Sequence, residues 1–118
     1  MINQTILNAF NTMWQNFPEP VMLIQKDRTI LAVNAMAQSA GIQPGIKCFT
    51  LNPEEKVQDH CSLCRADQAL SAGRAEILET TLGDKPATAY WVPLDGSDSL
   101  YLHFTTGYAN MLGLKTGT

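Results

Sequence analysis

Five segments of the chain have the length and composition of β-strands, and their order restricts the fold more than any other feature of the sequence. They are rich in β-branched and aromatic residues, and turn residues such as Gly83-Asp84 and Asp95-Gly96 separate the later ones, which is typical of hairpins. The expected strands cover 21–24, 30–33, 75–82, 87–94 and 99–106. Because two come early and three late, we expect two groups of antiparallel neighbours.

Helix signals occupy the segment between the two groups of strands. Asn and Asp side chains cap helix N-termini, and glycine ends helices because it adopts the left-handed conformation that other residues resist. The Asn-Pro-Glu-Glu run from Asn52 has the proline and the acidic first turn of a short helix. The expected helices cover 35–40, a turn or two after Asn52, and 60–72, with caps at Asn34 and Asp59 and ends at Gly41 and Gly73.

An amphipathic helix is predicted near the N-terminus, over residues 3–17. Its apolar residues recur at steps of three and four, and Pro18 and Pro20 stop it. The apolar stripe is broad and aromatic, so we expect part of it to be covered by a second copy of the chain rather than by one small sheet. The residues predicted for this core or dimer interface are Ile6, Phe10, Met13, Trp14 and Phe17.

Composition and charge narrow the class of protein. With 118 residues, 45% of them hydrophobic and 16% charged, the chain has the size and balance of one globular domain. The net charge of -3 and the lack of a Lys or Arg cluster argue against a nucleic-acid partner. No basic leader and no apolar run of about 18 residues is found, so we expect no signal peptide, no membrane partner and a cytoplasmic location.

The order of elements and several local residues resemble the PAS family of sensory domains. The likeness rests on the run from Phe17 to Ile24, the turn residue Asp27, the strand that ends at Asn34 and the segment 35–41. It implies an α+β fold, a five-stranded antiparallel sheet with short helices on one face and an N-terminal amphipathic helix. It also divides the chain into the N-terminal helix at 1–18, a PAS-like sensor domain at 19–108 and a C-terminal tail at 109–118.

The resemblance implies sensing and signalling rather than catalysis. Family members enclose haem, flavin or an organic acid, or bind nothing and dimerise, and pass a signal to a kinase, a cyclase or a transcription factor. No such effector lies in this sequence, so we expect a homodimer or a downstream signalling partner. The cofactor stays open, although the Asn-Cys-Arg-Phe-Leu stretch of photoreactive flavin relatives and the Cys-x-x-Cys-His haem motif are both absent.

Three cysteines form the most distinctive local pattern, Cys48 followed by Cys61 and Cys64. A similar arrangement occurs in one subset of PAS sequences, which often has prolines that this chain lacks. If the later pair lay in the first turn of a helix, the N–H groups there would favour metal-binding thiolates. With His60 or Asp59 as the fourth ligand, the site would suit zinc or an iron–sulfur cluster. Thiol redox sensing and simple burial of the cysteines are the alternatives.

The late strands supply the candidate ligand pocket. Side chains alternate between the two faces of a strand, so His103 points away from Leu102 and Phe104, and only one of Tyr90 and Trp91 can line the core. Axial ligation of haem would need His60 or His103. The residues predicted for the pocket are Tyr90, Leu102, His103 and Phe104.

Catalytic patterns are missing from the sequence. We find no nucleophile placed beside a base, no paired carboxylates in an apolar setting and no phosphate-binding glycine loop, so we expect no enzyme activity and assign no catalytic residue. Three interpretations follow: a ligand-responsive sensor, a metal or thiol redox switch, and a ligand-free dimerisation scaffold.

Overall fold

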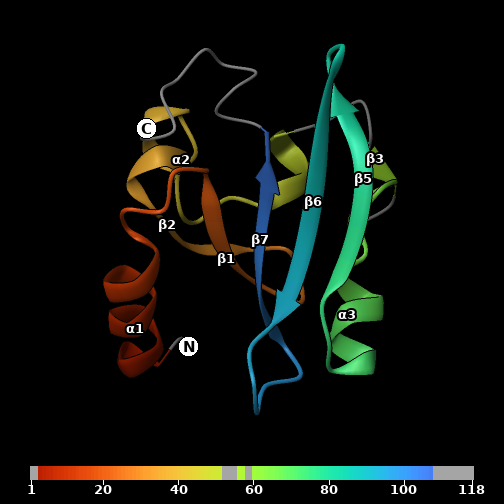
Figure 1. The fold of residues 1–118 in the computed structure, drawn as a ribbon. Coiled ribbons are helices and arrows are strands. Elements are labelled where there is room, and N and C mark those ends of the chain that lie inside the picture. Colours follow the sequence, from red (N-terminus) through yellow and green to blue (C-terminus); the bar gives the residue numbers. More distant parts are fainter. Residues whose placement is uncertain (1–2, 52–55, 58–59, 108–118) are drawn as a thin grey trace.

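The two predicted groups of strands pair into one antiparallel sheet with the order β2-β1-β7-β6-β5 (Figure 1). The computed structural model describes residues 3–51, 56–57 and 60–107. The central strand β7 joins the groups, because it pairs with β1 from Phe104 to Leu100 and with β6 along its other edge. The five-stranded antiparallel sheet is thereby confirmed. Its strands are β1 (Val21–Gln25), β2 (Ile30–Val33), β5 (Glu76–Leu82), β6 (Lys85–Pro93) and β7 (Leu100–Thr106).

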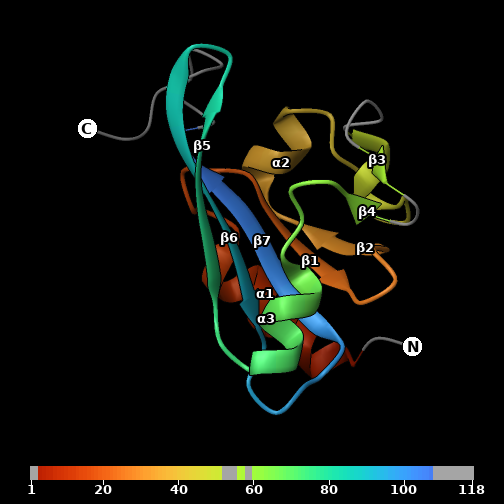
Figure 2. The same cartoon turned by 90° about the vertical axis from the view of Figure 1, so that its right-hand side faces the viewer.

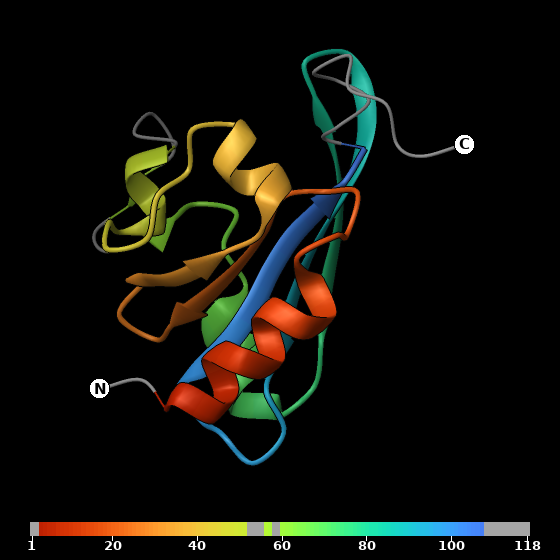
Figure 3. The ribbon, with the colours of Figure 1, turned by 90° about the vertical axis from the view of Figure 1, so that its left-hand side faces the viewer.

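The two faces of the sheet carry different covering elements. The helix α1 (Gln4–Trp14) lies across one face, which we call the α1 face (Figure 3). The other, which we call the inner face, is covered by shorter elements (Figure 2). These are α2 (Ala35–Ser39), the 3₁₀ helix η1 (Cys48–Leu51), the hairpin of β3 (Lys56–Val57) and β4 (His60–Cys61), and α3 (Ala66–Ala72).

Covering on both faces explains why β1 is a continuous apolar run. Val21 and Leu23 pack toward α1, whereas Met22 and Ile24 pack into the cluster on the inner face. On the α1 face the anchor is Phe10, which is 3% exposed. Burying a side chain of this size stabilises the docked helix by about 2 kcal/mol.

Two of the predicted helices differ in their bounds. α1 ends at Trp14 rather than at residue 17, because the Trp14 carbonyl accepts hydrogen bonds from Phe17 N and from the side chain of Asn34. The helix expected over 60–72 starts only at Ala66, since residues 60–61 pair with β3 instead. Its end at Gly73, with φ of 68°, is confirmed. The helix expected after Asn52, the cap at Asp59 and the tail at 109–118 lie outside the described residues.

Helix length also bears on membrane crossing. None of the helices within the described ranges is long and apolar enough to traverse a bilayer.

Asn34 is the polar centre of the fold. Its side chain is fully buried between α1, β1 and α2. The Oδ1 atom accepts hydrogen bonds from Val21 N at 2.9 Å and from Ala37 N at 3.0 Å. The Nδ2 atom donates to Trp14 O at 3.1 Å and to Glu19 O at 2.9 Å. One amide therefore caps α2, starts β1 and holds the end of α1, which a hydroxyl or a carboxylate cannot do alone.

We predict that Asn34→Ala destabilises the domain by about 4 kcal/mol, because four buried backbone groups lose their partners. The change is measured as the free energy of unfolding in urea. Asn11→Ala, on the exposed side of α1, is the matched control and should shift it by less than about 0.5 kcal/mol. Equal stability of the two variants would contradict the central role of Asn34.

Candidate functional site

A cavity of about 590 Å³ lies on the inner face of the sheet. Its floor is the inner face of β5, β6 and β7, and its cover comes from η1, β4 and the loops beside α2 and α3. The space is of the size at which proteins hold small organic ligands. The lining residues are Pro20, Met22, Ala40, Ile42, Cys48, Leu51, Cys61, Leu63, Cys64, Leu78, Thr80, Thr81, Ala89, Trp91, Tyr101, His103, Phe104 and Thr105.

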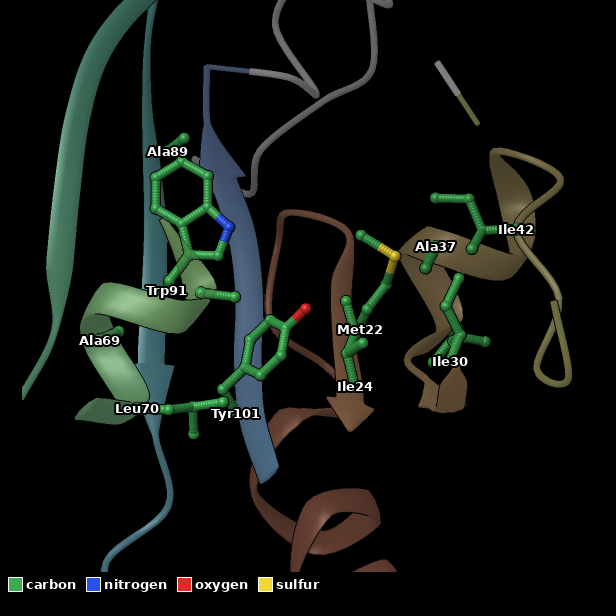
Figure 4. Packing of buried hydrophobic residues seen from close by; sticks show 12 residues of the cluster. Met22, Ile24, Ile30, Ala37, Ile42, Ala69, Leu70, Ala89, Trp91 and Tyr101 are labelled. Carbon is green, nitrogen blue, oxygen red and sulfur yellow. The ribbon is translucent and has the colours of Figure 1, made fainter. Parts of the chain in front are cut away.

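The walls of this cavity are mainly apolar. Figure 4 shows Trp91 and Tyr101 on one side, with Met22 and Ile42 facing them from the other. No Asp, Glu, Lys or Arg belongs to the lining within the part of the chain that the structure describes. Polar character comes only from three threonines, the thiols, Trp91, Tyr101 and His103.

Tyr101 carries a buried hydroxyl on the cavity floor. Its side chain is fully buried, and its Oη atom makes no hydrogen bond of normal geometry with the described residues. Burial, followed by the nearby Cys48 and Cys64 thiols, raises the pKa of Tyr101, and the Arg28 guanidinium only partly opposes this. The hydroxyl therefore stays protonated, and beyond its contact with the Cys48 thiol it keeps capacity for a further hydrogen bond.

His103 is held in one orientation by its neighbours. Its Nδ1 lies 2.8 Å from Tyr90 O, and its ring stacks on Trp91 with centroids 4.9 Å apart and planes at 17°. Burial lowers the pKa of His103, and the bond to Tyr90 O only partly offsets this effect. A carbonyl oxygen can only accept, so the proton of the neutral ring sits on Nδ1. The Nε2 atom is therefore left with a lone pair for hydrogen bonding.

The three cysteines line the same cavity, but Cys61 and Cys64 lie outside α3. Cys61 belongs to β4, and Cys64 precedes Arg65, the N-cap of α3. The expected placement of the pair in a first helical turn is thus wrong, because the β3–β4 hairpin takes that segment. None of the three sulfurs forms a disulfide. Burial, with the Cys64 and Cys61 thiols nearby, raises the pKa of Cys48 to about 12.

The predicted metal ligands lie partly outside the described residues. Among the side chains that the structure describes, no three of the His, Cys, Asp or Glu type come together as metal ligands. The His60 ring contacts the backbone of the neighbouring residue, with its Nδ1 atom 2.7 Å from the Cys61 carbonyl oxygen. Asp59 lies outside the described residues.

Arg28 is a buried charge in the tight turn between β1 and β2. It is 4% exposed, and its backbone has φ of 75°. The guanidinium donates to Lys26 O and pairs with Asp67 on α3 at 3.2 Å. Burial opposes the charge, but Asp67, with Cys64 and Tyr101, outweighs it, so the pKa of Arg28 is raised. No sequence signal separates such an arginine from an ordinary turn residue.

The predicted pocket residues are divided between the two faces of the sheet. His103 presents its side chain to the cavity, whereas Phe104 borders the cavity but packs its ring on the α1 face. Leu102 packs into the cluster beneath α1, and Tyr90 stacks on the Phe104 ring with centroids 4.8 Å apart, so neither lines the cavity. The cause is the alternation of side chains along β6 and β7. Trp91, Tyr101 and Thr80 take the places that Tyr90 and Leu102 were expected to hold.

The residues predicted for a dimer interface mostly pack within this chain. Ile6, Phe10, Trp14 and Phe17 belong to the cluster on the α1 face. The ring of Trp14 lies 5.7 Å from that of Phe104. Met13 alone of the predicted set is strongly exposed, at 68%.

Comparison with solved structures relates this architecture to known folds. A domain of an HTR-like protein from Haloarcula marismortui ATCC 43049 matches with a TM-score of 0.57 and 23% identity, covering 75% of this chain and 95% of that one. The PAS domain from Bordetella pertussis BvgS matches with a TM-score of 0.55 and 15% identity, covering 92% of both chains. The chain has a PAS-like fold.

A third structure agrees with this assignment. The sensory box sensor histidine kinase from Vibrio cholerae matches with a TM-score of 0.53 and 19% identity, and the alignment covers 86% of this chain and 83% of that one. No family model and no curated protein sequence matches the chain. At these identities the likeness establishes the PAS-like fold and leaves function to the residues of the site.

We predict that the domain loses stability as the pH falls below 6.5, the ordinary pKa of His. The pKa of His103 is lowered in the folded state, so protonation at low pH favours the unfolded chain. Stability is complete above this value and declines toward the lowered folded pKa. Unfolding in urea at pH 7 and pH 5 measures the loss. His103→Phe should lose less than the wild type, and an equal loss in both would contradict this account of His103.

Proposed function

We propose that this chain is a non-catalytic sensory domain that binds a small ligand in the cavity and relays its presence to a partner. The observation that carries the proposal is the cavity itself, whose floor holds two polar groups with unused hydrogen-bonding capacity, on Tyr101 and His103. Buried polar groups are normally paired, so unused ones in a cavity favour a missing partner. The PAS-like fold shared with a sensor histidine kinase structure supports a signalling role.

The relay that we propose runs through β7. Phe104 borders the cavity, but its ring lies on the α1 face, where it packs against Phe17 with centroids 5.5 Å apart and against Trp14 at the end of α1. A ligand that shifts β7 would therefore move this ring and change the docking of α1. The exposed Met13 makes α1 the surface on which we expect a second copy or a signalling protein to read the change. We also propose that the protein works in the cytoplasm.

A second candidate function is a thiol redox switch. The observation that favours it is the convergence of three thiols on one cavity, with Cys48 coming from η1 and Cys61 and Cys64 from the turn that ends β4. Two of these thiols would form a disulfide as one peroxide molecule is reduced to two water molecules. Since the raised pKa keeps Cys48 protonated, Cys61 or Cys64 would attack the peroxide first.

We predict that filling the cavity abolishes ligand binding. Thr80→Trp places a large ring into the cavity from β5, whereas Glu79→Trp, on the exposed side of the same strand, is the matched control. Native mass spectrometry of gently purified protein should show an excess mass in the wild type and in Glu79→Trp, but not in Thr80→Trp. No excess mass in the wild type, together with no thermal shift from a neutral small-molecule library, would count against the sensor.

For the redox candidate we predict that hydrogen peroxide produces a disulfide that includes Cys48. Peptide mapping without reductant would identify the bond, and a reductant would reverse it. Cys48→Ser should leave at most a bond between Cys61 and Cys64. If Cys48 stays a thiol while the other two are oxidised to acids, the switch is wrong.

A further inference from the structure

We infer that the cavity ligand is an uncharged, mainly apolar small molecule that donates a hydrogen bond to Nε2 of His103. This inference rests on the proposed function, because it names the chemistry of the ligand that the sensor would bind. It follows from three properties of the lining: its charge, the orientation of His103 and the buried hydroxyl of Tyr101.

The described part of the lining offers no partner for a buried charge on the ligand. A carboxylate or phosphate taken out of water needs a cation or several donors, and an ammonium needs an anion. The described lining contains neither Asp and Glu nor Lys and Arg. Arg28, the nearby buried cation, is already committed to Asp67 and Lys26 O, and it is not a lining residue.

His103 defines which polar group the ligand must carry. The ring is clamped between Trp91 and Tyr90 O, so it cannot rotate without losing both the stack and the hydrogen bond. Because Nδ1 carries the proton, Nε2 presents a lone pair and accepts. A ligand hydroxyl or N–H satisfies this acceptor, whereas an ether or a ketone does not.

Tyr101 supplies a second polar point on the same floor. Its side chain projects from β7 into the space between Trp91 and Met22 (Figure 4). Tyr101 and His103 lie two residues apart on this strand, so their side chains share the inner face. The Tyr101 hydroxyl can donate or accept, so it can bind the same ligand hydroxyl whose proton goes to His103. The apolar remainder of the ligand would lie against Met22, Ile42 and Leu78.

A matched series of probes tests the charge and the donor separately. 2-Naphthol is neutral and donates a hydrogen bond, 2-methoxynaphthalene has the same rings without the donor, and 2-naphthoate adds a charge. We expect 2-naphthol to bind about fivefold more tightly than the ether, which is the size of one net hydrogen bond. We expect the carboxylate to bind at least about tenfold more weakly than 2-naphthol. Titration followed by naphthalene fluorescence measures all three dissociation constants.

Variants assign the effect to His103. His103→Phe keeps a ring that can stack on Trp91 but removes the acceptor, so it should abolish the preference for 2-naphthol while the ether binds as before. His103→Gln, which retains an acceptor oxygen, should keep part of the preference. Tyr90→Phe is the control, since the Tyr90 side chain lies on the α1 face and the backbone carbonyl that holds His103 is unchanged.

The outcomes separate this inference from the proposed function. Tighter binding of 2-naphthoate, equal binding of naphthol and ether, or copurified haem or an organic acid would overturn the uncharged donor ligand, yet each would leave a ligand-binding cavity. The same holds if none of the probes binds and the protein nonetheless carries a charged small molecule. If none of the probes binds and native mass spectrometry shows no bound molecule, both the inference and the proposed sensor are wrong.

Discussion

Much of this structure depends on one buried amide. Asn34 lies where β2 ends and α2 begins. Its side-chain amide forms hydrogen bonds with backbone groups of α1, β1, α2 and the segment between α1 and β1. Such groups at the edges of a sheet cannot reach water once they are covered, so each must find a partner inside the protein. A primary amide offers donors and acceptors together and carries no charge, which lets it serve all of these elements without the cost of a buried ion.

The layers built around this centre give β7 a double role. Its side chains alternate between a wall that packs on α1 and the floor of the cavity, and the strand is hydrogen-bonded on both edges. Pairing on both edges holds the two faces of β7 in a fixed relation to each other. Phe104 borders the cavity, but its ring packs on Trp14 and Phe17 on the α1 face. The backbone of β7 therefore joins the cavity floor to the surface that packs on α1.

Local patterns predicted the strands of the five-stranded sheet, but they missed the short β3–β4 hairpin and the face that some side chains take. Alternation and turn residues marked β1, β2, β5, β6 and β7 closely, because these signals lie within each segment. The start of α3 was misplaced, since the short pairing of residues 56–57 with 60–61 competes with helix formation and leaves almost no composition signal. Tyr90 and Leu102 were wrongly expected in the pocket, and the burial of Arg28 was not foreseen, because the face of a strand or the depth of a turn depends on what packs above it.

The sequence by itself determined the five strands of the main sheet, their order along the chain and the periodicity of each, because spacing and turn chemistry are properties of neighbouring residues. Only the tertiary structure decided which face of β7 lines the cavity and which ring nitrogen of His103 is left as a hydrogen-bond acceptor. It also brought Cys48, Cys61 and Cys64 to the same cavity, where no metal site forms among the described residues. These features join segments far apart along the chain. Their geometry depends on long-range packing and desolvation, which no local pattern encodes.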